Sequence, residues 1–266
     1  MTTELLSDFE RFQFSGAGTT RDVYRAGSGP AVIVMAEMPG ITPKVLEFAR
    51  RVVDIGCTVY VPQLFGRPGE PPSLAAYARM APGACVSRQF SAFALGRTAP
   101  VGLWLRALAR QVHVDCGGPG VGAIGMCFTG GFALGMTVDT SVIAPVLSQP
   151  SLPLGFSARS RSDLGLSPED LALVKQRTVD EGICVLGMRF TGDRLVPAER
   201  FETLRRELGD AFIGVEIDSS PGNPWGIRKA AHSVVTEDLV ADDPDHPTRR
   251  ALYQVLEFFR SRLLPS

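Results

Sequence analysis

The sequence predicts an α/β fold, in which a mainly parallel central sheet carries helices on both faces. Apolar runs such as 31–36 and 121–126 are typical of strands that are buried on both faces of a parallel sheet. Segments with apolar residues at helical spacing alternate with these runs along the chain. A length of 266 residues fits one such domain, and we find no internal repeat or linker that would divide residues 1–266.

The N-terminal part of the chain begins with a hairpin, followed by a strand, helix, strand unit. Alternating polar and apolar residues at 11–25 predict the hairpin, which would lie at the sheet edge. Apolar runs predict buried strands at 30–36 and 58–61, and the helix at 43–55 between them has Pro43 in its first turn. Because the connections in this unit are short, its two strands are expected to be parallel.

In the rest of the chain, helix and strand signals alternate up to the C-terminus. Pro and Gly interrupt residues 63–100 repeatedly, which predicts a long irregular segment, and segments of this kind are often functional. Beyond it, proline starts and apolar spacing indicate the helices, while apolar runs indicate the strands. The expected elements are helices at 100–114, 128–138, 168–177, 197–208 and 247–264, and strands at 121–126, 141–147, 183–190 and 211–218.

Composition and charge exclude several classes of function. The chain has 27 Lys and Arg against 28 Asp and Glu, without a long run of either sign, so we expect no nucleic-acid partner. No apolar run is long enough for a bilayer, and the N-terminus lacks the features of a secretion signal, so we expect no membrane association and a cytoplasmic location. The five cysteines contain no Cys-x-x-Cys pair, which favours reduced thiols. Without a second ligand pair beside His113 and Cys116, and without a phosphate-binding or dinucleotide motif, we expect no metal and no cofactor.

The segment Val121-Gly-Ala-Ile-Gly-Met-Cys-Phe-Thr-Gly-Gly predicts a nucleophile at Cys127. A buried strand enters a helix here through a tight turn with the cysteine at its apex, as in a nucleophile elbow. The strained apex needs small neighbours such as Gly125 and Gly130, but Thr129 stands where a second glycine is common, so we expect the helix to pack farther away or to bend. The helix N-terminus favours the thiolate. The other cysteines are interpreted as inert residues: Cys57, Cys85, Cys116 and Cys184.

A thiol nucleophile needs a base, and the base needs a carboxylate that orients it. Asp193 follows the strand expected at 183–190, and His232 lies in the loop after the last strand, so both should meet Cys127 at the carboxyl edge of the sheet. The order cysteine, aspartate, histidine therefore predicts a catalytic triad. The weaker candidates are Asp218, as a substitute acid, and Asp163, His113 and His246, which are interpreted as structural or exposed residues.

Four segments resemble, in order, signature segments of the dienelactone hydrolase family. They are Met35-Ala-Glu-Met-Pro-Gly-Ile, Gly125-Met-Cys-Phe-Thr-Gly-Gly, Thr191-Gly-Asp-Arg-Leu-Val-Pro and Ala231-His-Ser, and the likeness extends over roughly residues 30–262. The resemblance implies an α/β-hydrolase fold. It also implies a small-molecule ester or lactone substrate that is cleaved through a thioester acyl-enzyme.

The resemblance also implies roles for particular residues. Cys127, His232 and Asp193 would form the triad, and the backbone N–H groups of Met38 and Phe128 would form the oxyanion hole. A carboxylate at the position of Glu37 contacts the resting thiol in that family and helps to control its ionisation.

The chain departs from the family at the site that would bind a substrate carboxylate. Family enzymes that act on dienelactone use arginines there, one of them four residues after the catalytic histidine, where this chain has Thr236. Arg79, Arg88 and Arg97 could replace that arginine, and Arg88 is the candidate substrate-binding residue. The side chains that could line an acyl or aromatic pocket are Phe65, Leu74, Tyr77, Phe90 and Phe93.

Two other functions stay open on the sequence. A general carboxylesterase or thioesterase would use the same triad, and its activity on simple aryl esters rather than cyclic enol-lactones would distinguish it. A binding or redox-sensing protein could keep the fold and a reactive Cys127 without turning over an ester, although the presence of both acid and base argues against it. The sequence is compatible with a monomer or a homodimer.

Overall fold

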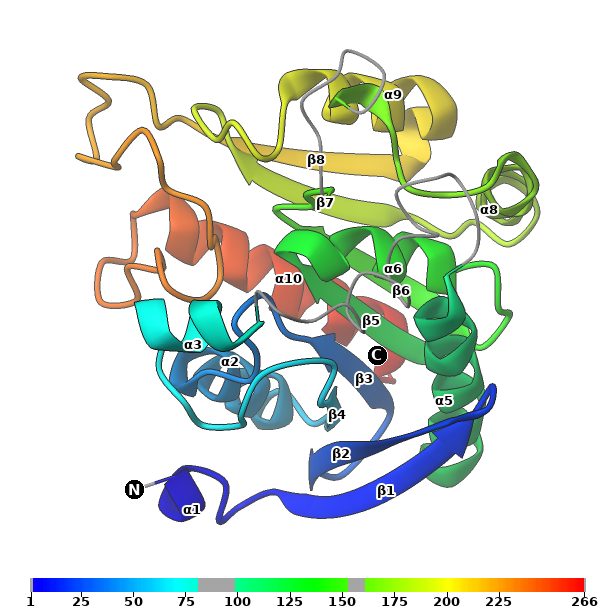
Figure 1. Ribbon diagram of the computed structural model, residues 1–266. Helices are drawn as coiled ribbons and strands as arrows, with labels where there is room; N and C mark the ends of the chain where they lie inside the picture. The colour runs from blue at the N-terminus through cyan, green and yellow to red at the C-terminus, as the bar shows by residue number, and fades with distance from the viewer. Residues whose placement is uncertain (1, 81–98, 153–160, 266) are drawn as a thin grey trace.

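The computed structural model describes residues 2–80, 99–152 and 161–265 (Figure 1). The strands are β1 Glu10–Gly16, β2 Thr19–Gly27, β3 Ala31–Met35, β4 Thr58–Pro62, β5 Val121–Met126, β6 Val142–Ser148, β7 Val185–Phe190 and β8 Phe212–Ile217. The α-helices are α1 Thr2–Leu5, α2 Pro43–Asp54, α3 Leu74–Met80, α5 Pro100–Cys116, α6 Gly130–Met136, α8 Pro168–Asp180, α9 Ala198–Leu208 and α10 Pro247–Leu263. Two short 3₁₀ turns are η2 Cys127–Thr129 and η3 Gly209–Ala211.

All eight of these strands belong to one sheet, in the order β1-β2-β4-β3-β5-β6-β7-β8. The hairpin strands β1 and β2 are antiparallel at one edge, and β2 also pairs antiparallel with β4. Every other neighbouring pair is parallel. The predicted fold class and the predicted edge position of the hairpin are therefore confirmed.

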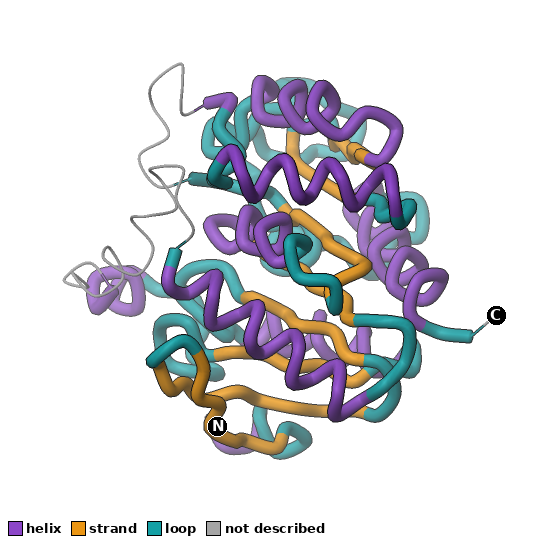
Figure 2. Tube along the Cα trace, turned by 90° about the vertical axis from the view of Figure 1, so that its right-hand side faces the viewer, coloured by secondary structure: helices purple, strands orange, loops and turns teal. Residues whose placement is uncertain are grey.

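Helices cover both faces of the sheet, so that the strands form the middle layer (Figure 2). Apolar side chains of α2 and α10 pack against one face, together with alternate residues of the central strands. On the other face, α5 and α6 cover the middle of the sheet, and α9 packs beside β7 and β8. Because side chains alternate across a strand, residues 31–35 of β3 are buried on both faces, which explains their continuous apolar run.

Two local differences from the sequence prediction have physical causes. The helix expected at 128–138 begins instead as the 3₁₀ turn η2 and becomes α6 only at Gly130. The Thr129 hydroxyl accepts the N–H of Met126 at 2.8 Å, which favours a tight first turn. Residues 74–80, expected to be irregular, form the short helix α3, which Ser73 caps by accepting the N–H of Ala76.

The parallel register places several loops together at the carboxyl edge of the sheet. Met35 of β3 pairs with Gly125 of β5, and Ser148 of β6 pairs with Met126 and with Met188 of β7. The segments that follow β3, β5, β6, β7 and β8 therefore start from neighbouring positions, as ligand sites in open α/β sheets require. Within the described residues, no helix is long and apolar enough to cross a membrane.

Candidate active site

Cys127 lies at the apex of the turn between β5 and η2, with a backbone φ of 55°. This left-handed conformation is strained for a residue with a side chain, and it persists because the surroundings impose it. A Cβ at Gly125 would lie 2.0 Å from the Thr129 carbonyl oxygen, and a Cβ at Gly130 would lie 2.7 Å from Cα of Pro150. Both glycines are therefore needed for the close approach that forms the turn.

The Thr129 hydroxyl connects the turn to the end of β3. Its hydroxyl lies 2.9 Å from the carbonyl oxygens of Met35 and Met126, in a fully buried position. The expectation that this threonine would make the helix pack farther away or bend stays a prediction, and the segment begins as the 3₁₀ turn η2 before α6. The hydroxyl thereby links the Cys127 turn to the strand that leads into Glu37.

Asp193, which is buried, and His232, which is partly buried, form a hydrogen-bonded pair next to this turn. Oδ2 of Asp193 accepts from Nδ1 of the imidazole at 2.6 Å, and the two side chains are 5% and 18% exposed. Asp193 is itself oriented by the N–H of Leu195, which donates to its Oδ1 at 2.9 Å. A carboxylate bound to Nδ1 fixes the tautomer of the ring, so that Nε2 is the atom left for proton transfer.

The His232 ring also interacts with Cys127. Nε2 is buried and has no hydrogen-bond partner of standard geometry within the described residues, so its contact with the thiol is a looser one. Burial alone disfavours the charged ring, but hydrogen bonding with Asp193 and Cys127 and the charges of both residues raise the pKa of His232 to about 11. Long catalytic hydrogen bonds are common before substrate binds. This arrangement favours the charged form of the His232 ring.

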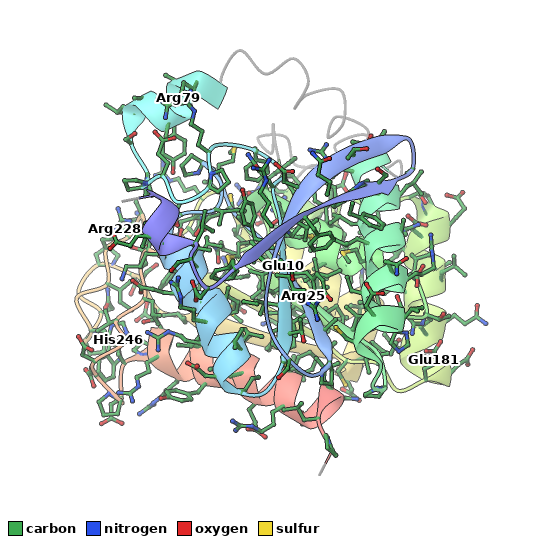
Figure 3. The ribbon with its side chains drawn as sticks, turned by 90° about the horizontal axis from the view of Figure 1, so that it is seen from below. Glu10, Arg25, Arg79, Glu181, Arg228 and His246 are labelled. Atoms are coloured by element: carbon green, nitrogen blue, oxygen red, sulfur yellow. The ribbon has the colours of Figure 1, made fainter. Side chains whose placement is uncertain are left out.

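Asp238 holds the loop that carries His232. Its Oδ2 accepts the backbone N–H groups of His232 and Ser233 at 2.8 and 3.0 Å. Arg228, on the outer side of the same loop (Figure 3), donates to the other oxygen of Asp238 at 2.9 Å. Sequence reasoning did not assign Asp238 a role.

Glu37 lies 4% exposed beneath the histidine loop, and three donors surround its carboxylate. Oε2 accepts from Oγ of Ser233 at 2.6 Å and from Nε2 of Gln149 at 3.1 Å, and Oε1 accepts from the Thr236 hydroxyl. Gln149 also accepts the N–H of Val234 at 3.3 Å, which extends the network along the loop. Glu37 therefore connects the end of β3 to the segment after His232.

The sulfur of Cys127 has a different hydrogen-bond partner. Oγ of Ser151, in the segment after β6, lies 3.2 Å from Sγ, and the Ser151 N–H donates to the Cys127 carbonyl at 3.0 Å. A bond between Glu37 and this sulfur is not among the hydrogen bonds of the described residues, so the control of the thiol by Glu37 stays a prediction. Ser151 was missed because it lies in a Pro-containing loop without a recognisable motif.

Comparison with protein families decides the assignment. The model of the dienelactone hydrolase family matches residues 20–263. The chain belongs to this family. The family consists of hydrolases, and the predicted resemblance is thereby confirmed. No curated protein matches the chain.

Solved structures with the same fold include several dienelactone hydrolase relatives. A dienelactone hydrolase from Anabaena variabilis is similar with a TM-score of 0.62 and 14% identity, covering 96% of this chain and 99% of that one. A cold-adapted esterase from an Arctic intertidal metagenomic library has a TM-score of 0.60 and 16% identity, with 96% and 94% covered. A dienelactone hydrolase-like promiscuous phosphotriesterase from metagenomic libraries has a TM-score of 0.56 and 17% identity, with 96% and 98% covered. At these identities, the likeness demonstrates the shared α/β-hydrolase fold.

The two residues that the family implies for the oxyanion hole follow Cys127 and Glu37 in the chain. Phe128 follows the cysteine in η2, and its ring packs edge to face with Phe132 at 5.6 Å. Met38 follows Glu37, and its carbonyl accepts the Tyr77 hydroxyl at 3.3 Å. Their role as an oxyanion hole stays a prediction.

Tyr77 brings α3 close to the site. Burial raises the pKa of its phenol, and the negative charges of Glu37, Cys127 and Glu237 raise it further. Arg79, on the same helix (Figure 3), forms an ion pair with Glu70. It also lines a hollow of about 240 Å³ together with Pro39, Gly66, Arg67, Glu70 and Ala76. The candidate substrate-binding residue Arg88 lies outside the described residues, as do Arg97, Phe90, Phe93 and Cys85.

The weaker candidates from the sequence have local structural partners. His246 caps the start of α10, where its Nδ1 lies 2.7 Å from the Thr248 hydroxyl (Figure 3). Asp218 accepts the Ser220 N–H at 2.8 Å, and this bond lowers the pKa of its carboxyl. Asp163 accepts the Gly165 N–H at 2.7 Å, and Nε2 of His113 lies 3.2 Å from the Gly118 carbonyl oxygen. In the described part of the chain, no group of three or more His, Cys, Asp or Glu could hold a metal ion.

Proposed function

We propose that this member of the dienelactone hydrolase family hydrolyses a carboxylic ester or lactone through a thioester on Cys127. His232 would act as general base and acid, and Asp193 would orient it. One observation carries the proposal: the cysteine at a strained strand-to-helix turn faces the imidazole of a buried Asp193–His232 pair. A strained conformation that the surrounding structure imposes on a nucleophilic residue is typical of active sites.

In the first half of the reaction, the thiolate of Cys127 attacks the carbonyl carbon of the ester. The electron pair of the carbonyl moves to oxygen, where the N–H groups of Met38 and Phe128 would stabilise the negative charge. When the intermediate collapses, the C–O bond of the leaving group breaks, and Nε2–H of His232 donates its proton to the departing alkoxide. The products are an alcohol, or the ring-opened hydroxyl of a lactone, and a thioester.

In the second half, neutral His232 removes a proton from water as the water oxygen attacks the thioester carbonyl. The C–S bond breaks, the acid leaves, and the sulfur and imidazole return to the charged pair. Asp193 supports the positive ring in both halves, since its carboxylate remains bound to Nδ1 at 2.6 Å.

The surroundings of Glu37 favour neutral esters as substrates over dienelactone. The position of the carboxylate-binding arginine is occupied by Thr236, whose hydroxyl is bound to Glu37. The charged groups that interact with Tyr77 beside the thiol are the acidic residues Glu37 and Glu237. A substrate carboxylate beside Thr236 would meet this negative charge, and position 236 itself supplies no cation.

A substrate screen with wild type and Cys127→Ala tests the proposal. The panel contains simple aryl esters, thioesters and cyclic enol-lactones, and the alanine variant is expected to lose turnover of every substrate that the wild type hydrolyses. Rapid mass spectrometry of the wild type should detect an acyl group on Cys127 during turnover of a slow ester. Turnover that survives in Cys127→Ala would refute the cysteine mechanism. A reactive thiol with no turnover of any substrate would favour the binding or redox-sensing alternative.

A further inference from the structure

Ser151 contacts the nucleophile with both its backbone and its side chain. Its N–H donates to the Cys127 carbonyl at 3.0 Å, and its Oγ lies 3.2 Å from Sγ. Both residues are 7% exposed. The hydroxyl is thus held against the reacting sulfur in a place that is largely shielded from water.

The segment that carries Ser151 is fixed from several sides. Pro150 packs against Gly130, and a Cβ at that glycine would lie 2.7 Å from Cα of the proline. The Pro150 carbonyl accepts from Nη1 of the buried Arg200 at 2.8 Å, and the Gln149 N–H donates to the Met188 carbonyl at 2.8 Å. These bonds restrict the backbone that leads into Ser151 and so help to hold its hydroxyl near the sulfur.

The bond between this hydroxyl and the sulfur favours the charged form of Cys127. A thiolate is a stronger hydrogen-bond acceptor than a thiol, and a serine hydroxyl is a better donor than S–H. Within the described residues, the hydrogen-bond partner found for the Ser151 hydroxyl is Sγ of Cys127. The hydrogen bonds found for Glu37 in the described part of the chain come from Gln149, Ser233 and Thr236.

Several titratable groups face the same sulfur from other elements. His232, in the loop after β8, and Tyr77, on α3, both interact with Cys127 through charge. Glu37, after β3, adds a negative charge that also acts on Tyr77. Helix α6 has no charged residue, and Arg200 behind the Ser151 segment donates to the carbonyls of Pro150, Asp163 and Leu195. His232 therefore contributes the compensating positive charge, and Ser151 contributes the direct hydrogen bond.

We propose that Ser151 is a further catalytic residue, whose hydroxyl donates a hydrogen bond to the Cys127 thiolate and keeps the resting nucleophile charged. The inference rests on the proposed function in taking Cys127 as the nucleophile, but it concerns the resting sulfur rather than turnover. Ser151 takes the place at the sulfur that the family implies for a carboxylate, while the carboxylate of Glu37 holds the histidine loop.

The test follows alkylation of Cys127 by iodoacetamide as a function of pH, measured on the Cys127 peptide by mass spectrometry. In Ser151→Ala, the midpoint of the labelling rate is expected to rise by about one pH unit, which corresponds to about tenfold slower labelling at pH values below both midpoints. Ser151→Thr keeps a hydroxyl and should keep the wild-type midpoint. Ser141→Ala serves as a matched control, because it removes a buried hydroxyl from the other end of β6, where the hydroxyl binds Asp139 at 2.7 Å.

An unchanged midpoint in folded Ser151→Ala overturns the inference, whatever happens to ester hydrolysis. An equal shift in Ser141→Ala also overturns it, because loss of any buried hydroxyl would then suffice. Ester turnover is measured on the same samples, and thermal unfolding verifies that each variant is folded. A raised midpoint in Ser151→Ala, combined with a wild type that hydrolyses no ester, supports the role of Ser151 and refutes the proposed function.

Discussion

The substitution Asp193→Asn tests how much the buried pair contributes to the reaction. It keeps the size of the side chain and removes the charge that lies 2.6 Å from Nδ1 of His232. The asparagine amide can also present N–H to the ring, which would require Nδ1 to accept and would leave the ring neutral, with its proton on Nε2. Both effects act on proton transfer and leave the turn at Cys127 intact.

The size of the effect follows from the kind of bond that is lost. A hydrogen bond to a charged group contributes about 1.5–3 kcal/mol, and the upper value applies here because the Asp193 side chain is only 5% exposed. At about 1.4 kcal/mol for each factor of ten, loss of about 3 kcal/mol from the transition state lowers kcat by about 10²-fold. An inverted tautomer lowers it further.

The assay compares kcat and KM of wild type and Asp193→Asn on the best ester from the substrate screen. We expect kcat to fall by about 10²-fold or more while KM changes little, because Asp193 contacts the base rather than the substrate. A variant that retains more than about a third of the wild-type kcat would refute the role of Asp193 as the orienting acid.

The same pair makes stability depend on pH. Folding raises the pKa of His232 from 6.5 to about 11, in spite of burial, through Asp193 and Cys127. The stability gained from the charged ring is therefore fully present below pH 6.5 and is lost as the pH rises toward 11. In urea titrations, the difference in unfolding free energy between wild type and Asp193→Asn should become smaller as the pH rises through this range. A difference that grows with pH would contradict the charged pair.

Three other perturbations test the site and its scaffold. Iodoacetamide at neutral pH should label Cys127 before the other four cysteines. Cys57 should react slowly, because burial raises the pKa of its thiol to about 11. If peptide mapping finds that another cysteine is labelled first, the assignment of Cys127 as the nucleophile loses its main support. Glu37→Gln should lower the unfolding free energy by about 3 kcal/mol in urea titrations, because an amide oxygen cannot accept from all three buried donors. If stability is unchanged but the pH profile of Cys127 alkylation shifts, the result would instead support the contact with the thiol that the family implies. Gly125→Ala should abolish activity and lower the melting temperature, because its Cβ would lie 2.0 Å from a backbone oxygen. Gly135→Ala is the control and should be tolerated, because the nearest neighbour of its Cβ is an arginine side-chain atom at 4.0 Å. Equal effects of the two substitutions would contradict the close approach at the turn.

The sequence predicted the sheet and the positions from which the site is built. Buried strands and amphipathic helices have distinct spacings of apolar residues, so the alternation of elements from β3 to α10 could be derived locally. The turn at Cys127 was also accessible, because its strained geometry requires glycines at fixed distances along the chain. The acid and the base could be expected at one edge, since parallel strands bring their carboxyl ends together.

Tertiary structure decided which side chains meet at that edge. Glu37 binds Ser233 and Thr236, which lie almost two hundred positions away in the chain, at 196 and 199 residues of separation. Ser151 reaches the sulfur of Cys127 from the segment after the neighbouring strand. Contacts of this kind depend on loop conformations and rotamers, which the packing of other elements determines, and no local spacing encodes them. The sequence alone therefore determined the fold and the loops in which the triad candidates lie, whereas the folded chain placed the hydroxyl of Ser151 at hydrogen-bond distance from the sulfur.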